Sequence, residues 1–238
     1  MKEEDPTWLM GFLLVKNPAV QTISIDHSQY INTILKRFNM SDCDPTKIPL
    51  DPVHMLLKDD GPSTDGDKAK MANKPYHKLI GALTWISVTS HPEIAFAATH
   101  LAQFNSNPGE AHWEARKTVL KYLKGAINWH LTLRLHDENP TEFTTYSDSD
   151  WGRDVDSCRS ITGYVFLLGL SAIPWSTKKQ TTVAMLSVDG KYQAGSMTVH
   201  HGLWLRCLLI ELGLNELGIS PTTTLINNQG AIDLTKDN

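Results

Sequence analysis

The sequence predicts an α/β protein in two parts: a mainly helical N-terminal part, and a C-terminal part in which helices pack on a mixed sheet. Three observations carry this prediction. Apolar residues recur at helical spacing between residues 75 and 125, short strand patterns begin after residue 142, and a long helical pattern at 187–212 interrupts them. We therefore place one domain at residues 1–135 and a second at residues 141–238.

The N-terminal part opens with two expected strands, "WLMGFLLVKN" and "AVQTISID", which a turn at Asn17 and Pro18 joins. The next segment, "DHSQYINTILKRF", has Ile31, Ile34 and Leu35 at helical spacing. This part is thus expected to start as a hairpin followed by a helix.

Segment 41–75 is rich in Pro, Asp, Lys and Gly, which predicts a loop. Three helical patterns follow at approximately 75–89, 92–105 and 109–125. Because proline is tolerated at the first position of a helix, Pro92 fits the start of the second one.

After a short connection at 128–142, the pattern changes to strands. The expected order is three strands, a long helix, a fourth strand and the start of a last helix: "FTTYSDSD", "SITGYVFLLG", "SAIPWSTKKQTTVA", residues 187–212, "TTTLIN" and "NQGAIDLTKDN". Gly190, Gly195 and Gly202 lie inside the long helix, where each is expected to cost about 1 kcal/mol against alanine and to loosen the helix start. Apolar residues still form a stripe from Val199 onward.

The composition limits the function. A formal net charge of -4 argues against a strongly basic nucleic-acid surface, and the three cysteines are too far apart to predict a zinc site or a disulfide framework. The acidic start "MKEEDPTW" is unlike a signal peptide, and no apolar run is long enough to span a bilayer. We expect an intracellular protein of the cytoplasm or nucleus, with no membrane partner, and the sequence identifies no small-molecule substrate.

Two segments, "TTYSDSDWGRD" and "TVAMLSVDGKYQAGS", indicate the corners of a metal-carboxylate site. Cleavage of a phosphodiester by two metal ions needs carboxylates that converge and hold the metals about 3.5–4 Å apart. One fold supplies them from a strand, the start of a helix and the end of a neighbouring strand. Here these places fall on Asp148, position 191 and position 227.

The motifs "YSDSDWGRDVDSCRSITGYVFLLG" and "IPWSTKKQTTVAMLS" resemble the ribonuclease H domain of copia-type LTR retrotransposon Pol polyproteins. Upstream, "FLLVKNPAVQTISIDHSQYINTILKRFNMSDC" and "YHKLIGALTWISVTSHPEIAFAATHLAQFNSNPGEAHWEARKTVLKYLKG" resemble the part of these polyproteins after the polymerase active site. The resemblance covers nearly the whole chain. It implies a thumb- or connection-like end of a reverse transcriptase at 1–135, and a truncated ribonuclease H-like domain, a mixed sheet with packed helices, at 141–238.

The resemblance also shows which site residues differ. The polymerase hairpin, Tyr-x-Asp-Asp, would precede residue 1. The first carboxylate of the ribonuclease H site falls on Asp148, but the second position, a glutamate in the family, holds Lys191. The third, an aspartate in the family, holds Asn227, and the fourth would follow Asn238.

These substitutions predict a degenerate fragment without catalysis of its own. The family is expected to use Mg²⁺, whereas one retained ligand out of four predicts no bound Mg²⁺ here, with Asp148 and Asp150 as a weak metal pair at most. The Lys191 ammonium is expected to repel a metal ion and to pair with Asp148.

Two alternatives stay open. The first is a nucleic-acid-binding module that keeps the ribonuclease H fold and contacts an RNA–DNA hybrid or another nucleic acid. Its candidate contacts are Arg116, Lys117, Lys121, Lys124, Lys178 and Lys179. The second is a weakly active ribonuclease for RNA–DNA hybrids that uses rearranged ligands. A solvated helix face is the plainer explanation for the basic residues between 109 and 125.

Overall fold

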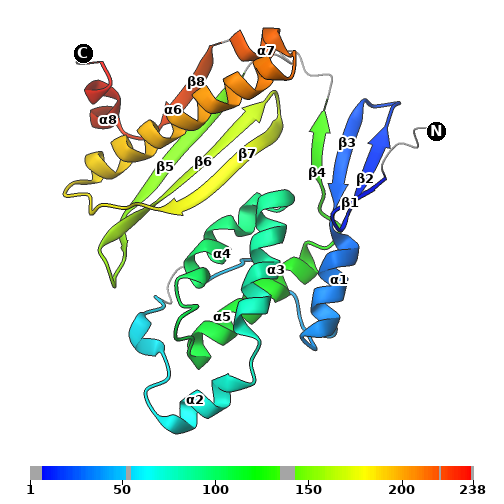
Figure 1. The fold of residues 1–238 in the computed structure, drawn as a ribbon, viewed down its shortest axis with the longest axis vertical. Coiled ribbons are helices and arrows are strands. Elements are labelled where there is room, and N and C mark those ends of the chain that lie inside the picture. Colours follow the sequence, from blue (N-terminus) through cyan, green and yellow to red (C-terminus); the bar gives the residue numbers. More distant parts are fainter. Residues whose placement is uncertain (1–6, 52–54, 135–142, 220, 237–238) are drawn as a thin grey trace. The chain divides into compact units, whose positions relative to one another are not determined.

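The computed structural model describes residues 7–51, 55–134, 143–219 and 221–236. The chain divides between Thr132 and Leu133 into two compact units, which Figure 1 shows as ribbons. The first unit has a small sheet with helices, and the second has a mixed four-stranded sheet packed with helices. The predicted mixed α/β class is therefore confirmed.

The small sheet of the first unit has the strand order β1-β2-β3-β4. Its first three strands are antiparallel neighbours: β1 (Trp8–Leu9), β2 (Phe12–Asn17) and β3 (Thr22–Asp26). The first expected strand is split, because Met10 and Gly11 both take positive φ angles and turn the chain back on itself.

The fourth strand, β4 (Leu131–Arg134), was not predicted, since it lies in the segment expected to be a short connection. It joins the sheet next to β3. The hydroxyls of Ser24 and Thr132 lie 3.0 Å apart across these two strands. A strand of four residues carries too little periodicity to be recognised without its partner.

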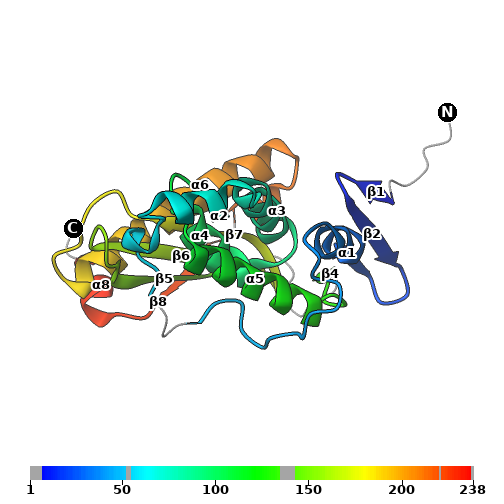
Figure 2. The same ribbon diagram turned by 90° about the horizontal axis from the view of Figure 1, so that it is seen from below.

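The first unit contains five helices among its described residues, and all but α2 were predicted from the sequence. They are α1 (Ser28–Arg37), α2 (Asp65–Ala72), α3 (Tyr76–Thr89), α4 (Ala95–Ala102) and α5 (Glu110–Gly125), with short 3₁₀ turns at Lys58–Asp60 and Pro92–Ile94. The helix expected at 92–105 begins as the second of these turns. Figure 2 shows α1 beside the small sheet.

Helix α2 corrects the expectation of a loop over residues 41–75. The Thr64 hydroxyl accepts a hydrogen bond from the backbone N–H of Asp67 and caps the helix. Asp65 and Asp67 lie in the first turn, where negative charge is favourable beside the exposed N–H groups. Capping and charge, and not an apolar stripe, therefore define this helix, which is why the apolar pattern did not reveal it.

The core of the first unit lies among α1, α3, α4 and α5. Its fully buried side chains are aliphatic residues from these helices and the turn before α4: Ile31, Leu79, Leu83, Ile86, Ile94, Leu101, Val119, Leu120 and Leu123. Each of the predicted apolar faces is buried here, so helix packing supplies most of the stability of this unit.

A pair of buried histidines lies beside this core. His27, between β3 and α1, is 1% exposed, and its Nδ1 bonds to the Ser90 hydroxyl. His91 is 2% exposed, and its Nδ1 lies 2.7 Å from the Glu93 carboxylate. No described residue bonds to the Nε2 atom of either ring. Burial lowers the pKa of His27 to about 4, and His91 adds to this shift while Asp26 opposes it.

The sheet of the second unit has the order β7-β6-β5-β8. Its strands are β5 (Phe143–Asp154), β6 (Arg159–Leu168), β7 (Ser171–Lys179) and β8 (Thr222–Ile226). Strand β6 runs antiparallel to both β5 and β7, and β8 is parallel to β5. All four strands were predicted. Pro174 is accommodated because β7 is an edge strand with a register shift opposite Phe166.

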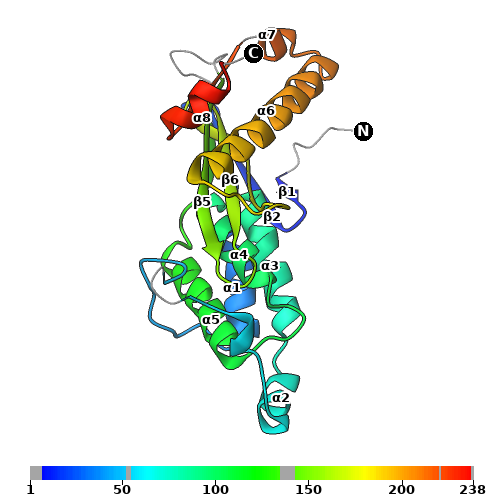
Figure 3. The ribbon, with the colours of Figure 1, turned by 90° about the vertical axis from the view of Figure 1, so that its left-hand side faces the viewer.

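Helix α6 (Ser187–Glu211) packs on this sheet and connects β7, through α7 (Asn215–Ile219), to β8. It matches the predicted long helix. The last helix, α8 (Gln229–Leu234), packs against α6, as Figure 3 shows. The connection through α6 is what allows β8 to run parallel to β5.

The face of α6 that meets the sheet is made of small residues. Gly190, Ala194, Gly195, Thr198 and Gly202 are all buried there. A Cβ atom on Gly195 would lie 2.8 Å from Ile226 Cδ1, and one on Gly202 would lie 3.3 Å from Phe166 Cε1. The glycines therefore permit close packing of the helix on the sheet, a role that the sequence did not predict.

The bulky apolar residues of α6 lie on its other side. Val199 is 52% exposed, Leu203 54% and Trp204 57%. The stripe expected from Val199 onward is thus not the surface that packs on the sheet. Because a small-residue face lacks an apolar stripe, periodicity selected the wrong side of the helix.

The buried His27 ring predicts a pH dependence of stability in the first unit. A histidine with a folded pKa of about 4 and an unfolded pKa near 6.5 takes up its proton first in the unfolded state. The free energy of unfolding should therefore fall, by about 3 kcal/mol at most, as the pH decreases from 6.5 to 4.

Urea denaturation across this pH range measures the effect. His27→Asn should flatten the dependence, because asparagine does not titrate, while the exposed His77→Asn should keep it. An unchanged slope in His27→Asn would contradict the assignment.

The small-residue face of α6 predicts a second stability effect. Gly202→Leu should destabilise the second unit by about 1–3 kcal/mol, because its side chain overlaps the Phe166 ring. Thermal denaturation should show no such loss for Ser196→Leu, an exposed position on the same helix. Equal stability of the two variants would mean that α6 does not lie this close to the sheet.

Candidate functional site

Asp148 lies on β5 just beyond the end of β8. The last paired residues of the two strands are Ser147 and Ile226. Side chains alternate along β5: Ser147 and Ser149 are buried towards α6, whereas the Asp148 side chain is 65% exposed. The carboxylate therefore occupies the open corner where a neighbouring strand has ended.

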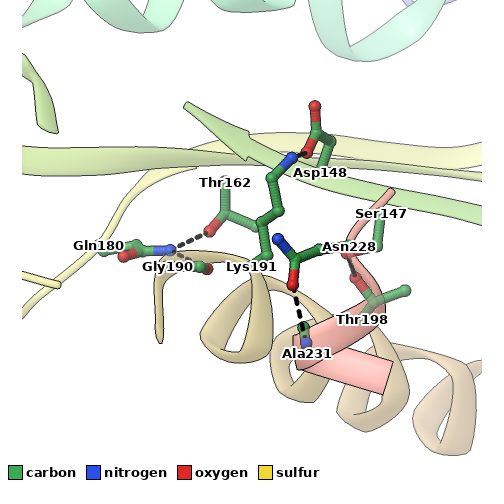
Figure 4. A network of polar contacts seen from close by, with 9 residues as sticks. All are labelled: Ser147, Asp148, Thr162, Gln180, Gly190, Lys191, Thr198, Asn228 and Ala231. Carbon is green, nitrogen blue, oxygen red and sulfur yellow. Dashed lines mark hydrogen bonds and ion pairs between the residues drawn. The ribbon is translucent and has the colours of Figure 1, made fainter. Parts of the chain in front are cut away.

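Lys191 reaches this corner from the start of α6. Its ammonium forms an ion pair with the Asp148 carboxylate, as expected from the sequence. Figure 4 shows the lysine side chain running from the helix to the strand. Only 16% of the Lys191 side chain is exposed, but 65% of the Asp148 side chain is, so water and salt reach the carboxylate end of the ion pair.

Asn227 follows Ile226 directly, so the strand register puts it next to Asp148 along the sheet. It is exposed and contributes an uncharged amide to the corner. The next residue, Asn228, is committed to structure, because its Oδ1 accepts a hydrogen bond of 2.8 Å from the N–H of Ala231 and caps α8 (Figure 4).

Asp150 lies two residues along β5 from Asp148. Its carboxylate accepts a hydrogen bond from the backbone N–H of Ile161 on β6. Burial raises the pKa of Asp150, the Ile161 hydrogen bond opposes this, and the charge of Asp148 adds to it. The two carboxylates predicted as a weak metal pair are therefore each held by another partner.

The side chains at this corner do not fit a magnesium site. Mg²⁺ in proteins is held largely by carboxylates and water. The three positions together supply one carboxylate, one amide and one ammonium, and the ammonium cancels the charge of the carboxylate. Across the described ranges, no three His, Cys, Asp or Glu side chains are grouped so as to hold a metal ion.

Two polar residues that the sequence did not single out, Gln180 and Thr198, hold α6 against the sheet. The Gln180 amide donates hydrogen bonds to the Thr162 hydroxyl, at 3.0 Å, and to the Gly190 carbonyl, at 2.9 Å. Further along α6, the Thr198 hydroxyl bonds to the Ser147 hydroxyl at 2.9 Å. Figure 4 shows both contacts beside the ion pair. Both Gly190 and Thr198 belong to α6, so these contacts depend on how the helix packs on the sheet, which sequence spacing does not reveal.

Arg116 was predicted as a nucleic-acid contact, and its burial excludes it from any exposed surface. The residue is 0% exposed, its guanidinium lies over the Tyr76 ring, and it donates to the Tyr76 carbonyl and to Asn105 Oδ1. Burial lowers the pKa of Arg116 to about 9, so the group stays charged at neutral pH. Arg116 therefore has a structural role within the first unit.

The five predicted lysines lie on two different elements. Lys117, Lys121 and Lys124 belong to α5, where Lys117 pairs with Glu114 at 2.5 Å and Lys124 donates to the Cys43 carbonyl at 2.6 Å. The other two belong to β7 in the second unit: Lys178 is exposed, and Lys179 pairs with Asp154. Of the five ammonium groups, those of Lys117 and Lys179 are thus paired with carboxylates.

The Asp154 carboxylate is held in an ionised state. Burial alone would raise the pKa of Asp154, but hydrogen bonds from Lys179 and Ser157 outweigh burial and keep the pKa below its usual value. The Lys179 charge is therefore neutralised locally.

No helix in the described parts of the chain is both long and apolar enough to cross a membrane.

Three curated proteins illustrate what the chain is similar to. It is 33% identical over 238 residues, its full length, to the retrovirus-related Pol polyprotein from transposon TNT 1-94 of Nicotiana tabacum. It is 33% identical over 230 residues, 96% of its length, to the retrovirus-related Pol polyprotein from transposon RE1 of Arabidopsis thaliana. It spans only 18% and 15% of these two polyproteins.

The third relative is the secreted RxLR effector protein 161 of Plasmopara viticola. The identity is 38% over 135 residues, which cover 57% of this chain and 94% of the effector. No family model matches the chain, and no solved structure matches it.

The buried guanidinium gives a prediction that separates structure from nucleic-acid contact. Arg116→Ala should lower the free energy of unfolding of the first unit by about 3 kcal/mol, because it leaves the Tyr76 carbonyl without its donor. Lys121→Ala, on the same helix, should change it by less than about 0.5 kcal/mol. Urea denaturation measures the free energy of unfolding of both variants. Equal values for Arg116→Ala and Lys121→Ala would contradict the structural role of Arg116.

Proposed function

We propose that this chain carries two consecutive regions of a Pol polyprotein. The premise is that the chain belongs to the Pol polyproteins of copia-type retrotransposons. Residues 1–135 would be the thumb- or connection-like end of the reverse transcriptase. Residues 141–238 would be a ribonuclease H-like domain that has lost catalysis. The parent activity would be RNA-directed DNA synthesis coupled to cleavage of the RNA strand in RNA–DNA hybrids.

The observation that carries this proposal is the ion pair between Lys191 and Asp148. The family resemblance assigns both positions to metal-binding carboxylates. An ammonium at one of them occupies the remaining carboxylate and places a positive charge where a divalent cation would bind. Loss of the metal site would then follow from charge, while the strand and helix that carry it remain in place.

The charge difference is large on the scale of metal binding. A glutamate replaced by Lys191 changes the local charge by two units, and an aspartate replaced by Asn227 changes it by one. Because Mg²⁺ affinity at oxygen sites depends on carboxylate charge, this corner is expected to bind the ion poorly. Hydrolysis that depends on two metal ions would then be absent.

Binding of nucleic acid without cleavage is the second candidate function. The exposed Lys178 on β7 favours it, because an unpaired ammonium at the surface suits contact with a phosphate. The partner would be an RNA–DNA hybrid or another nucleic acid. Binding of a labelled hybrid should then weaken steadily as the salt concentration rises.

The loss of the metal site is tested by restoring its charge. The double variant Lys191→Glu and Asn227→Asp should bind Mg²⁺ measurably in calorimetry, because three carboxylates then meet at one corner. The unmodified chain should show no such heat. Hybrid cleavage is not required of the variant, since Mg²⁺ binding alone reports the restored charge of the corner.

A matched control carries the same change in net charge elsewhere. Lys236→Glu with Asn128→Asp alters two exposed positions and should leave Mg²⁺ binding unchanged. Strong Mg²⁺ binding by the unmodified chain would contradict the proposal. So would hybrid cleavage that disappears in Asp148→Asn, because Asp148 would then form an active site with ligands other than positions 191 and 227.

A further inference from the structure

The two edges of the sheet in the second unit differ in their chemistry. The order β7-β6-β5-β8 puts β7 at one edge and β8 at the other, as Figure 1 shows. Edge strands of natural proteins often carry a proline, a lysine or a bulge, which keeps them from pairing with another chain. Strand β7 has all three: Pro174, the exposed Lys178 and a register shift opposite Phe166. The β7 edge is therefore protected against pairing.

Strand β8 has none of these protective features. Its five residues, "TTTLI", include no charged residue, glycine or proline, and they pair with β5 in an unbroken register. Among the residues that the structure describes, no strand lies on the other side of β8. Backbone N–H and C=O groups point to alternate sides along a strand, so about half of the residues of β8 direct theirs away from β5. This edge can accept another strand.

The side chains of β8 leave an apolar end on the open face of the sheet. Ile226 points towards α6, where it meets Gly195, so its neighbour Leu225 points to the opposite face. Leu225 is 45% exposed and lies beside Tyr146 on β5, which is 49% exposed and lies opposite Val165 on β6. A row of apolar side chains thus crosses three strands and stops at the unprotected edge.

A second copy of this chain fits the edge. Antiparallel pairing of two β8 strands about a two-fold axis at Thr224 places Thr223 of each copy opposite Leu225 of the other. Because β8 carries no charge, no like charges oppose each other across the axis, although the whole chain has a net charge of -4. The two Leu225 side chains become diagonal neighbours about 7–8 Å apart, so each covers the apolar end of the other copy.

The residues that flank β8 favour this register. Pro221 precedes the strand and has no N–H to donate, and Asn228 follows it as the cap of α8. A shift by two residues would therefore leave fewer residues paired. A shift by one residue would place side chains from opposite faces next to each other. The register centred on Thr224 is the one that pairs the whole strand.

We propose that two copies of this chain form a symmetric dimer by antiparallel pairing of their β8 strands, which joins the two sheets into one. Five residues from each copy make an interface smaller than that of a standard complex, so we expect a dissociation constant of about 10–100 µM. The dimer goes beyond the proposed function and uses none of the three positions at the Asp148 corner.

Sedimentation equilibrium of the full chain measures the association. Between about 1 and 500 µM, the mean mass should rise from that of the 26.6 kDa monomer towards twice this value. Leu225→Lys should weaken the association at least about tenfold, because it places two ammonium groups beside the axis. Leu170→Lys makes the same change at a position that is 73% exposed in the turn between β6 and β7, and it should leave the association unchanged.

A further variant tests the other apolar surface of this unit. Val199 is 52% exposed on the side of α6 that faces away from the sheet, and Val199→Lys should leave the association unchanged. If Val199→Lys abolishes the association and Leu225→Lys does not, the interface lies on α6 and the proposal is wrong.

Disulfide cross-linking tests the register. Thr223→Cys and Leu225→Cys are made separately in a background in which the exposed Cys158 and Cys207 are replaced by serine. Opposite residues of an antiparallel pair have Cα atoms about 4.5–5.5 Å apart, which suits a disulfide, whereas two copies of one position are diagonal and farther apart. Oxidation with copper–phenanthroline should therefore link a mixture of the two variants much more than either variant alone.

A chain that stays monomeric over the whole concentration range would overturn the proposal. So would unchanged association in Leu225→Lys, or cross-linking that is equal in the mixture and in the separate variants. Circular dichroism checks that Leu225→Lys folds. If it does not fold, sedimentation of the unmodified chain and the cross-linking still decide.

Discussion

The close approach of α6 to β5 and β6 is the constraint on which the second unit depends. Gly190, Gly195 and Gly202 face the sheet, and a Cβ atom at Gly195 would meet the Ile226 side chain. Because the backbone comes this near, the first turns of α6 bring Lys191 to Asp148 on β5, just beyond the end of β8. The same approach brings the Gly190 carbonyl within reach of the Gln180 amide. One packing contact thus sets both the ion pair between Lys191 and Asp148 and the hydrogen bond between Gln180 and Gly190.

The ion pair between Asp148 and Lys191 gives the corner its chemical character. Two oppositely charged groups satisfy each other where converging carboxylates would repel one another without a metal ion. A repulsive cluster of that kind needs a cation to hold it together, whereas the ion pair is complete without one. The elements of the fold can therefore keep their arrangement while the site changes from cation-binding to self-neutralised. This is the physical basis for the proposal that the corner no longer holds a cation.

Much of this arrangement follows from the sequence, because most helices and strands carry a clear apolar period. The pairing of Lys191 with Asp148 was also expected, since the order of elements brings both to one corner. Helix α2 was missed because a Thr64 cap and two acidic residues define it, and β4 because its pairing partner is distant in sequence. The helical glycines and Arg116 were misjudged for a shared reason: their roles depend on which neighbour they face, and composition does not reveal that.

The central proposal is that the Asp148 corner of the unmodified chain binds divalent metal ions poorly because Lys191 already neutralises it. The most direct measurement adds Mn²⁺ to the isotopically labelled chain and follows the amide signals in NMR spectra, since the paramagnetic ion broadens signals near its binding site. The account predicts no selective broadening of the signals around Asp148 and Lys191 at micromolar Mn²⁺. Selective loss of those signals, reversed by a chelator, would contradict it.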